Sequence, residues 1–182
     1  MNLFKDPILN TKKAFIFDLD GTLVDSLNFW RSFDWNVITP ADAYKFIAPY
    51  YVNSIPFKGT AEETLKKLTH NGIRCAIATA TDTKVCFPCI KRLGIDKFAD
   101  PILCCNDVGK DKSDPTLYLE CCKRLGVSAD EAVVVEDRQH AAKTAKAAGF
   151  FVIGISDKHN HDDTELPDIA DIYVDSLADI FA

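Results

Sequence analysis

AFIFDLDGTL, residues 14–23, is the stretch of this 182-residue chain that decides its fold. Four apolar residues that run into carboxylates and a turn predict a strand buried on both faces, as in a parallel sheet. Ligands of such sheets gather beyond the carboxyl ends of the strands. We therefore expect Asp18 and Asp20 at a reactive edge, although an ordinary strand end with an Asx turn uses the same residues.

The spacing of the two aspartates gives them a chemical use. Residues i and i+2 of an extended chain point the same way, so Asp18 and Asp20 face one spot. Two adjacent anions are costly unless a cation lies between them or one carries a proton. The pair therefore indicates a divalent metal, a division into acid and base, or both.

Composition places the chain among ordinary globular proteins, with 47% hydrophobic and 26% charged residues. A net charge of −6 argues against nucleic acid as a partner. No apolar run reaches membrane-spanning length, and residues 1–10 lack the core of a signal peptide. We expect a cytoplasmic protein that has no membrane partner.

The cysteines invite a disulfide or zinc interpretation, but their odd number, seven, and their apolar settings favour reduced thiols packed as small hydrophobes. Cys86-Phe-Pro-Cys89 is the one CxxC pattern, and no second CxxC or spaced histidine pair completes a metal site. A redox role for this pair is the alternative.

From Gly59 onward, apolar runs alternate with amphipathic segments. Strands are expected at residues 74–78, 102–105, 132–135, 150–155 and 171–174, with helices between them. Thr60 and Glu63 form a capping-box pattern, and Asp114 with Pro115 is typical of another helix start. This alternation predicts an α/β fold built on a doubly wound parallel sheet.

Residues 26–55 differ from the rest in composition. Nine of the 19 aromatic residues lie between Ser26 and Phe57. Phe29, Trp30 and Phe33 have helical spacing, and a second helix is expected to begin at Pro40. We interpret 1–25 and 56–182 as the α/β core and 26–55 as a small helical insertion. Its aromatic residues indicate either a satellite core or a lid or interaction surface, which includes a homodimer contact.

Chemically useful side chains follow four of the expected strands, and a parallel sheet brings them to one edge. They are Asp18 and Asp20, Thr79, Lys112, and Glu136 with Asp137. A nucleophile, an acid, a hydroxyl, a cation and further carboxylates are what phosphoryl transfer through a carboxylate requires. Lys110 is the alternative to Lys112 as the cationic residue of the site. Thr79 and Asp137 could instead cap the helices that follow them. The polar loop with His159, His161, Asp162 and Asp163 is expected to face solvent.

These four motifs, in this order, resemble those of the haloacid dehalogenase superfamily over nearly the whole chain. The resemblance implies a Rossmann-type core with a helical cap, here shortened to 26–55. It implies that Asp18 attacks phosphorus, that Asp20 protonates the leaving oxygen and then activates water, and that Thr79 and Lys112 hold phosphoryl oxygens. Mg²⁺ would be held by Asp18, the backbone carbonyl of Asp20, and Asp137, with Glu136 alongside.

The second carboxylate, Asp20, separates activities within the family, because phosphatases and phosphomutases keep it and dehalogenases lack it. The resemblance therefore implies a Mg²⁺-dependent phosphatase acting on a small phosphomonoester. A sugar-phosphate mutase resembling phosphoglucomutase and a non-catalytic binding or regulatory protein are the alternatives. Two departures from the family pattern, Arg138 and Ala141, affect the loop after Asp137 rather than the metal ligands.

Overall fold

A computed structural model describes residues 2–32, 34 and 40–182, and its centre is a six-stranded parallel sheet. The strand order is β3-β2-β1-β4-β5-β6, so the strand that carries the AFIF run lies in the middle. The strands are β1 (Ala14–Phe17), β2 (Arg74–Thr79), β3 (Ala99–Cys104), β4 (Ala132–Glu136), β5 (Phe151–Ile155) and β6 (Ile172–Val174). The predicted doubly wound parallel sheet is confirmed.

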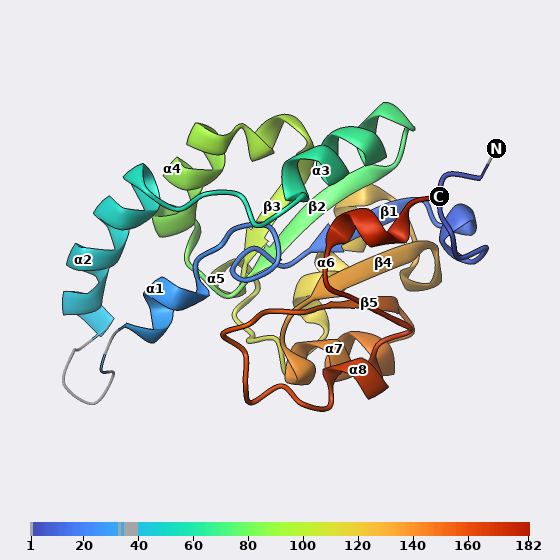
Figure 1. The fold of residues 1–182 in the computed structure, drawn as a ribbon. Helices are drawn as coiled ribbons and strands as arrows, with labels where there is room; N and C mark the ends of the chain where they lie inside the picture. The colour runs from blue at the N-terminus through green and yellow to red at the C-terminus, as the bar shows by residue number, and fades with distance from the viewer. Residues whose placement is uncertain (1, 33, 35–39) are drawn as a thin grey trace.

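Helices cover both faces of this sheet (Figure 1). The α-helices are α1 (Leu27–Arg31), α2 (Pro40–Asn53), α3 (Ala61–His70), α4 (Thr83–Leu93), α5 (Cys105–Val108), α6 (Thr116–Leu125), α7 (Gln139–Ala147) and α8 (Leu166–Ile169). Short 3-10 helices are η1 (Leu9–Thr11), η2 (Ile95–Lys97), η3 (Ala129–Glu131) and η4 (Leu177–Ile180). Within the described ranges, no helix has the length and apolar character needed to cross a membrane.

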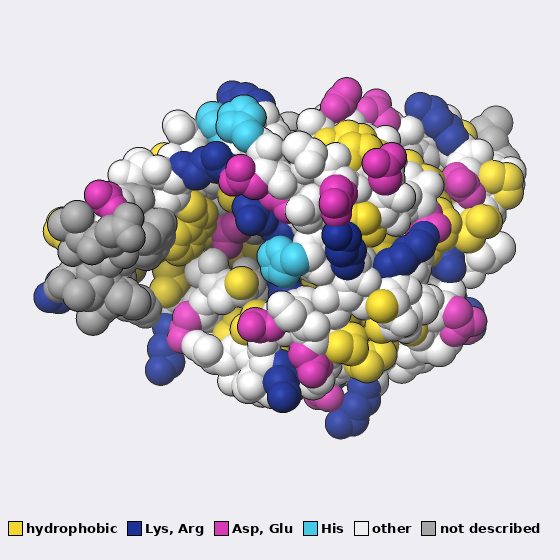
Figure 2. All heavy atoms as spheres, turned by 90° about the horizontal axis from the view of Figure 1, so that it is seen from below, with side chains coloured by type: hydrophobic (Ala, Val, Ile, Leu, Met, Phe, Trp, Pro, Cys, Tyr) yellow, Lys and Arg dark blue, Asp and Glu magenta, His cyan; other side chains and the backbone are white. Residues whose placement is uncertain are grey.

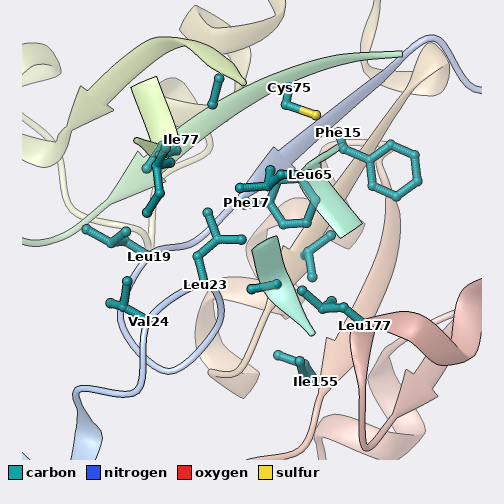
Figure 3. Close-up of a cluster of buried hydrophobic side chains, with 14 of the residues drawn as sticks. Phe15, Phe17, Leu19, Leu23, Val24, Leu65, Cys75, Ile77, Ile155 and Leu177 are labelled. Atoms are coloured by element: carbon teal, nitrogen blue, oxygen red, sulfur yellow. The ribbon is translucent and has the colours of Figure 1, made fainter. Parts of the chain in front are cut away.

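The central strand sends alternate side chains into two separate hydrophobic clusters. Phe15 and Phe17 pack with the residues of α3, α4 and η4 (Figure 3), whereas Ala14 and Ile16 pack with those of α6, α7 and α8. All four are fully buried. Each large apolar side chain buried in this way stabilises the fold by about 1.5–3 kcal/mol. The centre of the sheet is thus a rigid base for the loops at its carboxyl edge.

Helices α1 and α2 stand to one side of the sheet, where α2 packs beside α4 (Figure 1). Arg92 of α4 links this helix to α2, because its Nε donates to the carbonyl oxygen of Val52 at 2.7 Å. Phe46 is 63% exposed. Phe33 lies outside the described residues. The division into a core and an insertion, and a dimer formed through the insertion, stay predictions.

Two helix starts differ from the expectation. The Thr60 hydroxyl makes no capping bond within α3 but contacts Ser176 Oγ at 2.8 Å and accepts from the amide of Ala178. This hydroxyl therefore ties α3 to the C-terminal η4, a tertiary contact that the local pattern does not encode. Helix α6 begins one residue later than expected, at Thr116, whose amide donates to Asp114 Oδ1.

All seven cysteines are free thiols, and all except Cys105 are buried. Burial raises the pKa of Cys75 and of Cys121 to about 12, and it raises the pKa of Cys86 as well. A buried thiol that stays protonated is a poor nucleophile. The structure therefore agrees with the prediction of thiols that pack as small hydrophobes.

We predict that iodoacetamide, applied to the folded protein at pH 8, modifies Cys105 first, because it is the one thiol that is not buried. The buried thiols should react only after the chain is unfolded in urea. Mass spectrometry of proteolytic peptides measures the modification at each position. Equally fast modification of Cys86 and Cys89 in the folded protein would contradict this and would revive a redox role for the CxxC pair.

Candidate active site

The loop after β1 is folded tightly against the core, and this fixes the two aspartates. The amides of Leu23 and Val24 both donate to the carbonyl oxygen of Leu19 at 2.9 Å. Leu19 and Leu23 are fully buried in the cluster shown in Figure 3. Since these leucines anchor the loop in the hydrophobic core, Asp18 and Asp20 are held at the carboxyl edge of the sheet.

Three carboxylates and one ammonium group meet at this edge. Asp18, Glu136 and Asp137 each offer an oxygen, and these oxygens lie within 4.8 Å of one another. Lys112 Nζ donates to Asp18 Oδ1 and, at 2.6 Å, to Glu136 Oε1. The cluster forms because β1 and β4 are hydrogen-bonded neighbours that end side by side. Of the two candidate lysines, Lys112 contacts the carboxylates, whereas Lys110 is exposed.

The charges of this cluster fit a divalent cation. When ionised, three carboxylates and one ammonium group leave two negative charges without compensation. Among the described residues, Asp18 Oδ2, Glu136 Oε2 and Asp137 Oδ1 are buried and lack a hydrogen-bond partner. Orphaned buried carboxylate oxygens are costly, and hard oxygen ligands are those that Mg²⁺ prefers. The donor set thus suits a hard divalent metal held by Asp18 and its neighbours.

Burial and mutual repulsion shift the pKa values of the cluster. Burial raises the pKa of Glu136 to about 7, although the charge of Lys112 opposes this shift. Burial also raises the pKa of Asp137, and the negative charges of Asp18 and Glu136 add to the effect. Burial alone would lower the pKa of Lys112, but Asp18 and Glu136 outweigh it and raise the pKa. The ammonium group of Lys112 therefore stays charged.

Asp20 lies beside this cluster in a different environment. Its Oδ1 accepts from Ser26 Oγ at 2.5 Å, from Trp30 Nε1 at 3.0 Å and from the Tyr51 hydroxyl. Its Oδ2 accepts from Thr81 Oγ1 at 2.7 Å. Burial raises the pKa of Asp20, and the charge of Asp18 raises it further, while the donated hydrogen bonds partly oppose both effects.

A cavity of about 290 Å³ opens at this edge. Its lining comprises Asp18, Asp20, Leu27, Trp30, Ala80, Thr81, Asp111, Lys112, Ser113, Asp137, Arg138 and His140. The face of the molecule in Figure 2 is hollowed where hydrophobic, acidic and basic side chains adjoin. The cavity therefore gives a ligand access to the aspartates, to Lys112 and to Asp137.

Thr79 ends β2 directly before the cavity residues Ala80 and Thr81 but is not part of the lining. Its Oγ1 accepts from the amide of Thr81 at 3.0 Å. A hydroxyl that accepts one bond can still donate its proton. Helix α4 is capped by Asp82 instead, whose side chain accepts from the amide of Lys84. The predicted role of Thr79 at a phosphoryl oxygen stays a prediction.

Two residues that support the cluster were missed from the sequence. The Tyr118 hydroxyl donates to Glu136 Oε1 at 2.8 Å. Asn160 Nδ2 donates to Asp137 Oδ2 at 2.9 Å and to the Asp137 carbonyl oxygen at 2.8 Å. The helical periodicity of α6 places Tyr118 on its buried face, but no local pattern indicates that Asn160 folds back onto Asp137.

The loop around Asn160 also corrects an expectation. Asp163 is buried rather than solvent-exposed, and its Oδ1 accepts from the amide of Gln139 at 2.7 Å. It also forms an ion pair with Arg138 at 3.3 Å. Asp163 thus supplies a carboxylate to the start of α7, which leaves Asp137 free to face the cluster. His161 and Asp162 are exposed as expected.

We predict that Lys112→Met destabilises the protein by about 3–5 kcal/mol, since it leaves buried carboxylates without their cation. Lys110→Met, in the same loop but exposed, should change stability by less than about 0.5 kcal/mol. Urea unfolding at pH 8, followed by circular dichroism, measures both. Equal effects of the two substitutions would show that the ammonium group at position 112 does not hold the cluster.

We predict that Gly21→Ala destabilises the protein more than Gly109→Ala. Both glycines have positive φ, 87° and 67°, which costs another residue about 1–2 kcal/mol. A Cβ at position 21 would also lie 2.5 Å from Asp137 Oδ2, whereas a Cβ at position 109 meets nothing within 4 Å. Urea unfolding of both variants separates collision from backbone strain. Similar losses would contradict the tight approach of Gly21 to Asp137.

Comparison with known proteins gives related sequences and folds. Phosphoglycolate phosphatase of Pectobacterium atrosepticum is 30% identical over 136 residues, which cover 72% of this chain and 58% of that protein. Validoxylamine A 7'-phosphate phosphatase of Streptomyces hygroscopicus subsp. limoneus is 28% identical over 120 residues, 66% of this chain and 55% of that protein. The chain thus spans little more than half the length of these relatives.

The fold itself matches along almost the whole chain. The crystal structure of a predicted phosphoglycolate phosphatase from Haemophilus somnus superposes with a TM-score of 0.78 at 22% identity, covering 93% of this chain and 96% of that one. The family model of haloacid dehalogenase-like hydrolases matches residues 44–155, more than half of the sequence. This matched segment contains Thr79, Lys112, Glu136 and Asp137. The chain belongs to the haloacid dehalogenase-like hydrolase family.

Proposed function

We propose that this protein is a Mg²⁺-dependent phosphatase that hydrolyses a small phosphomonoester through an aspartyl-phosphate on Asp18. The observation that carries the proposal is the buried cluster in which Lys112 pairs with Asp18 and Glu136 while three carboxylate oxygens keep no partner among the described residues. The phosphatase names of the two sequence relatives support the same reaction class. The free thiols support a reducing compartment such as the cytoplasm.

Asp18, Asp137 and the backbone carbonyl of Asp20 would hold the metal, with Glu136 alongside. Bound there, Mg²⁺ would supply positive charge that lets an anionic carboxylate approach an anionic phosphoryl group. Lys112 contributes a permanent positive charge of its own. Because it already donates to Asp18 Oδ1, Lys112 also fixes the orientation of the nucleophile.

The reaction proceeds in two displacement steps. In the first, an oxygen of Asp18 forms a bond to phosphorus while the ester P–O bond breaks, and the proton carried by Asp20 passes to the leaving oxygen. In the second, Asp20 takes a proton from a water molecule whose oxygen attacks phosphorus. The bond between Asp18 and phosphorus breaks, and inorganic phosphate and the original carboxylate are released.

The dimensions of the site support a small substrate. A cavity of about 290 Å³ lies at the lower end of the range of ligand pockets. Its lining includes Trp30 and Leu27 of the α1 segment together with Ser113, Arg138 and His140. A substrate with an apolar face and a few polar groups beside its phosphate suits this lining.

We predict that the purified protein with Mg²⁺ releases inorganic phosphate from at least one compound in a panel of small phosphomonoesters. Asp18→Asn should lower kcat by about 10³-fold or more, because the amide is not a nucleophile. Asp25→Asn, an exposed neighbour in the same segment, is the matched control and should retain activity. A colorimetric phosphate assay measures all three proteins, and EDTA should abolish release.

Four outcomes would contradict the proposal in different ways. Full activity of Asp18→Asn would remove Asp18 as the nucleophile, and activity unchanged by EDTA would remove the metal. Isomerisation of a sugar phosphate that needs a bisphosphate activator, without net phosphate release, would identify a mutase. Binding of phosphorylated compounds without any turnover would identify a non-catalytic member of the family.

A further inference from the structure

Two aromatic residues of the α1 and α2 helices reach the carboxylate of Asp20. Tyr51, on α2, is fully buried and donates its hydroxyl proton to Asp20 Oδ1. Trp30, on α1, donates its indole N–H to the same oxygen at 3.0 Å and to the Tyr51 hydroxyl at 2.8 Å. The two rings pack edge to face with their centroids 5.6 Å apart. Trp30, Tyr51 and Asp20 thus form one hydrogen-bonded unit.

The position of Tyr51 is itself fixed by packing. Arg92 of α4 donates to the carbonyl oxygen of Val52, the residue after Tyr51, and to that of Ile55, four residues after Tyr51. Ile55 is fully buried in the core cluster. Since the segment that follows the tyrosine is held against α4, its hydroxyl reaches Asp20 from a rigid support.

The donors divide unequally between the two oxygens of Asp20. Oδ1 accepts three hydrogen bonds, from Ser26, Trp30 and Tyr51, whereas Oδ2 accepts one, from Thr81. Thr81 also lines the cavity. Because Oδ1 already accepts hydrogen bonds from the α1 and α2 segments, Oδ2 is the oxygen that remains to face a reacting group. The alternative is a purely structural role, in which the buried Tyr51 hydroxyl simply needs a hydrogen-bond partner. That role does not explain why the partner is Asp20, a side chain that lines the cavity.

We propose that Tyr51, together with Trp30, is a positioning residue that holds the Asp20 carboxylate in one orientation, with Oδ2 directed at the leaving group. This inference rests on the proposed function, in which Asp20 protonates the leaving oxygen. It assigns to the aromatic insertion a part in catalysis that is separate from substrate choice. Loss of the contact should therefore slow the reaction according to how much the leaving group needs a proton.

The first test compares two leaving groups in Tyr51→Phe. An alkyl phosphate needs protonation of its leaving oxygen, whereas p-nitrophenyl phosphate needs little. We expect kcat for the alkyl phosphate to fall about 10-fold, as for loss of one hydrogen bond that orients the acid. The kcat for p-nitrophenyl phosphate should change less than about threefold. The matched control is Tyr50→Phe, the same change at the preceding residue. The ring of Tyr50 stacks on that of Phe29, with the ring centroids 3.9 Å apart. Equal losses on both substrates would overturn the inference.

The second test needs no activity. The chain has two tryptophans, so a ¹H–¹⁵N spectrum contains two indole cross-peaks, and Trp30→Phe identifies that of Trp30. We expect Tyr51→Phe and Asp20→Asn each to move the Trp30 cross-peak, and Tyr50→Phe to leave it in place. An unmoved cross-peak in both variants would overturn the inference. A protein that shows the shifts but cleaves no phosphomonoester would refute the proposed function while supporting the contact of Tyr51 and Trp30 with Asp20.

Discussion

The repulsion among buried carboxylates is the constraint on which this site depends. Asp18, Glu136 and Asp137 offer oxygens within 4.8 Å of one another, and burial removes the water that would screen their charges. Lys112 offsets part of this cost through its bonds to Asp18 and Glu136. A remaining excess of negative charge is stable only if protons or a cation join the cluster. The site is therefore organised around the binding of positive charge.

The packing of the parallel sheet offsets the cost of such a cluster. Its centre is apolar on both faces, so β1 and β4 are fixed by packing that does not involve the charges at their ends. The buried leucines at positions 19 and 23 then carry this rigidity into the loop that holds the aspartates. Stability generated in the core thus maintains an electrostatic arrangement at the edge that would not form by itself.

The sequence predicts the features that follow from periodicity and from topology. Apolar runs of four to six residues located the strands, and parallel order alone brought Lys112 and Glu136 to the edge that carries Asp18. Contacts between segments with no shared pattern were not predictable. Asn160 reaches Asp137 across 23 residues, and the Thr60 hydroxyl bonds to Ser176 across 116 residues instead of capping its own helix. Such side chains find their partners only when the chain is folded.

The two aspartates that looked equivalent in the sequence have different surroundings. Asp18 faces the neighbouring strands and is paired with a cation, Lys112. Asp20 faces the α1 and α2 helices, and the side chains that donate to it, those of Ser26, Trp30, Tyr51 and Thr81, are all neutral. Burial and the negative charge of Asp18 raise the pKa of Asp20, and the hydrogen bonds donated to it oppose this shift only in part. Unequal environments of this kind separate a nucleophile from an acid. The helical insertion supplies three of the four donors, Ser26, Trp30 and Tyr51, and therefore helps to give Asp20 surroundings that differ from those of Asp18.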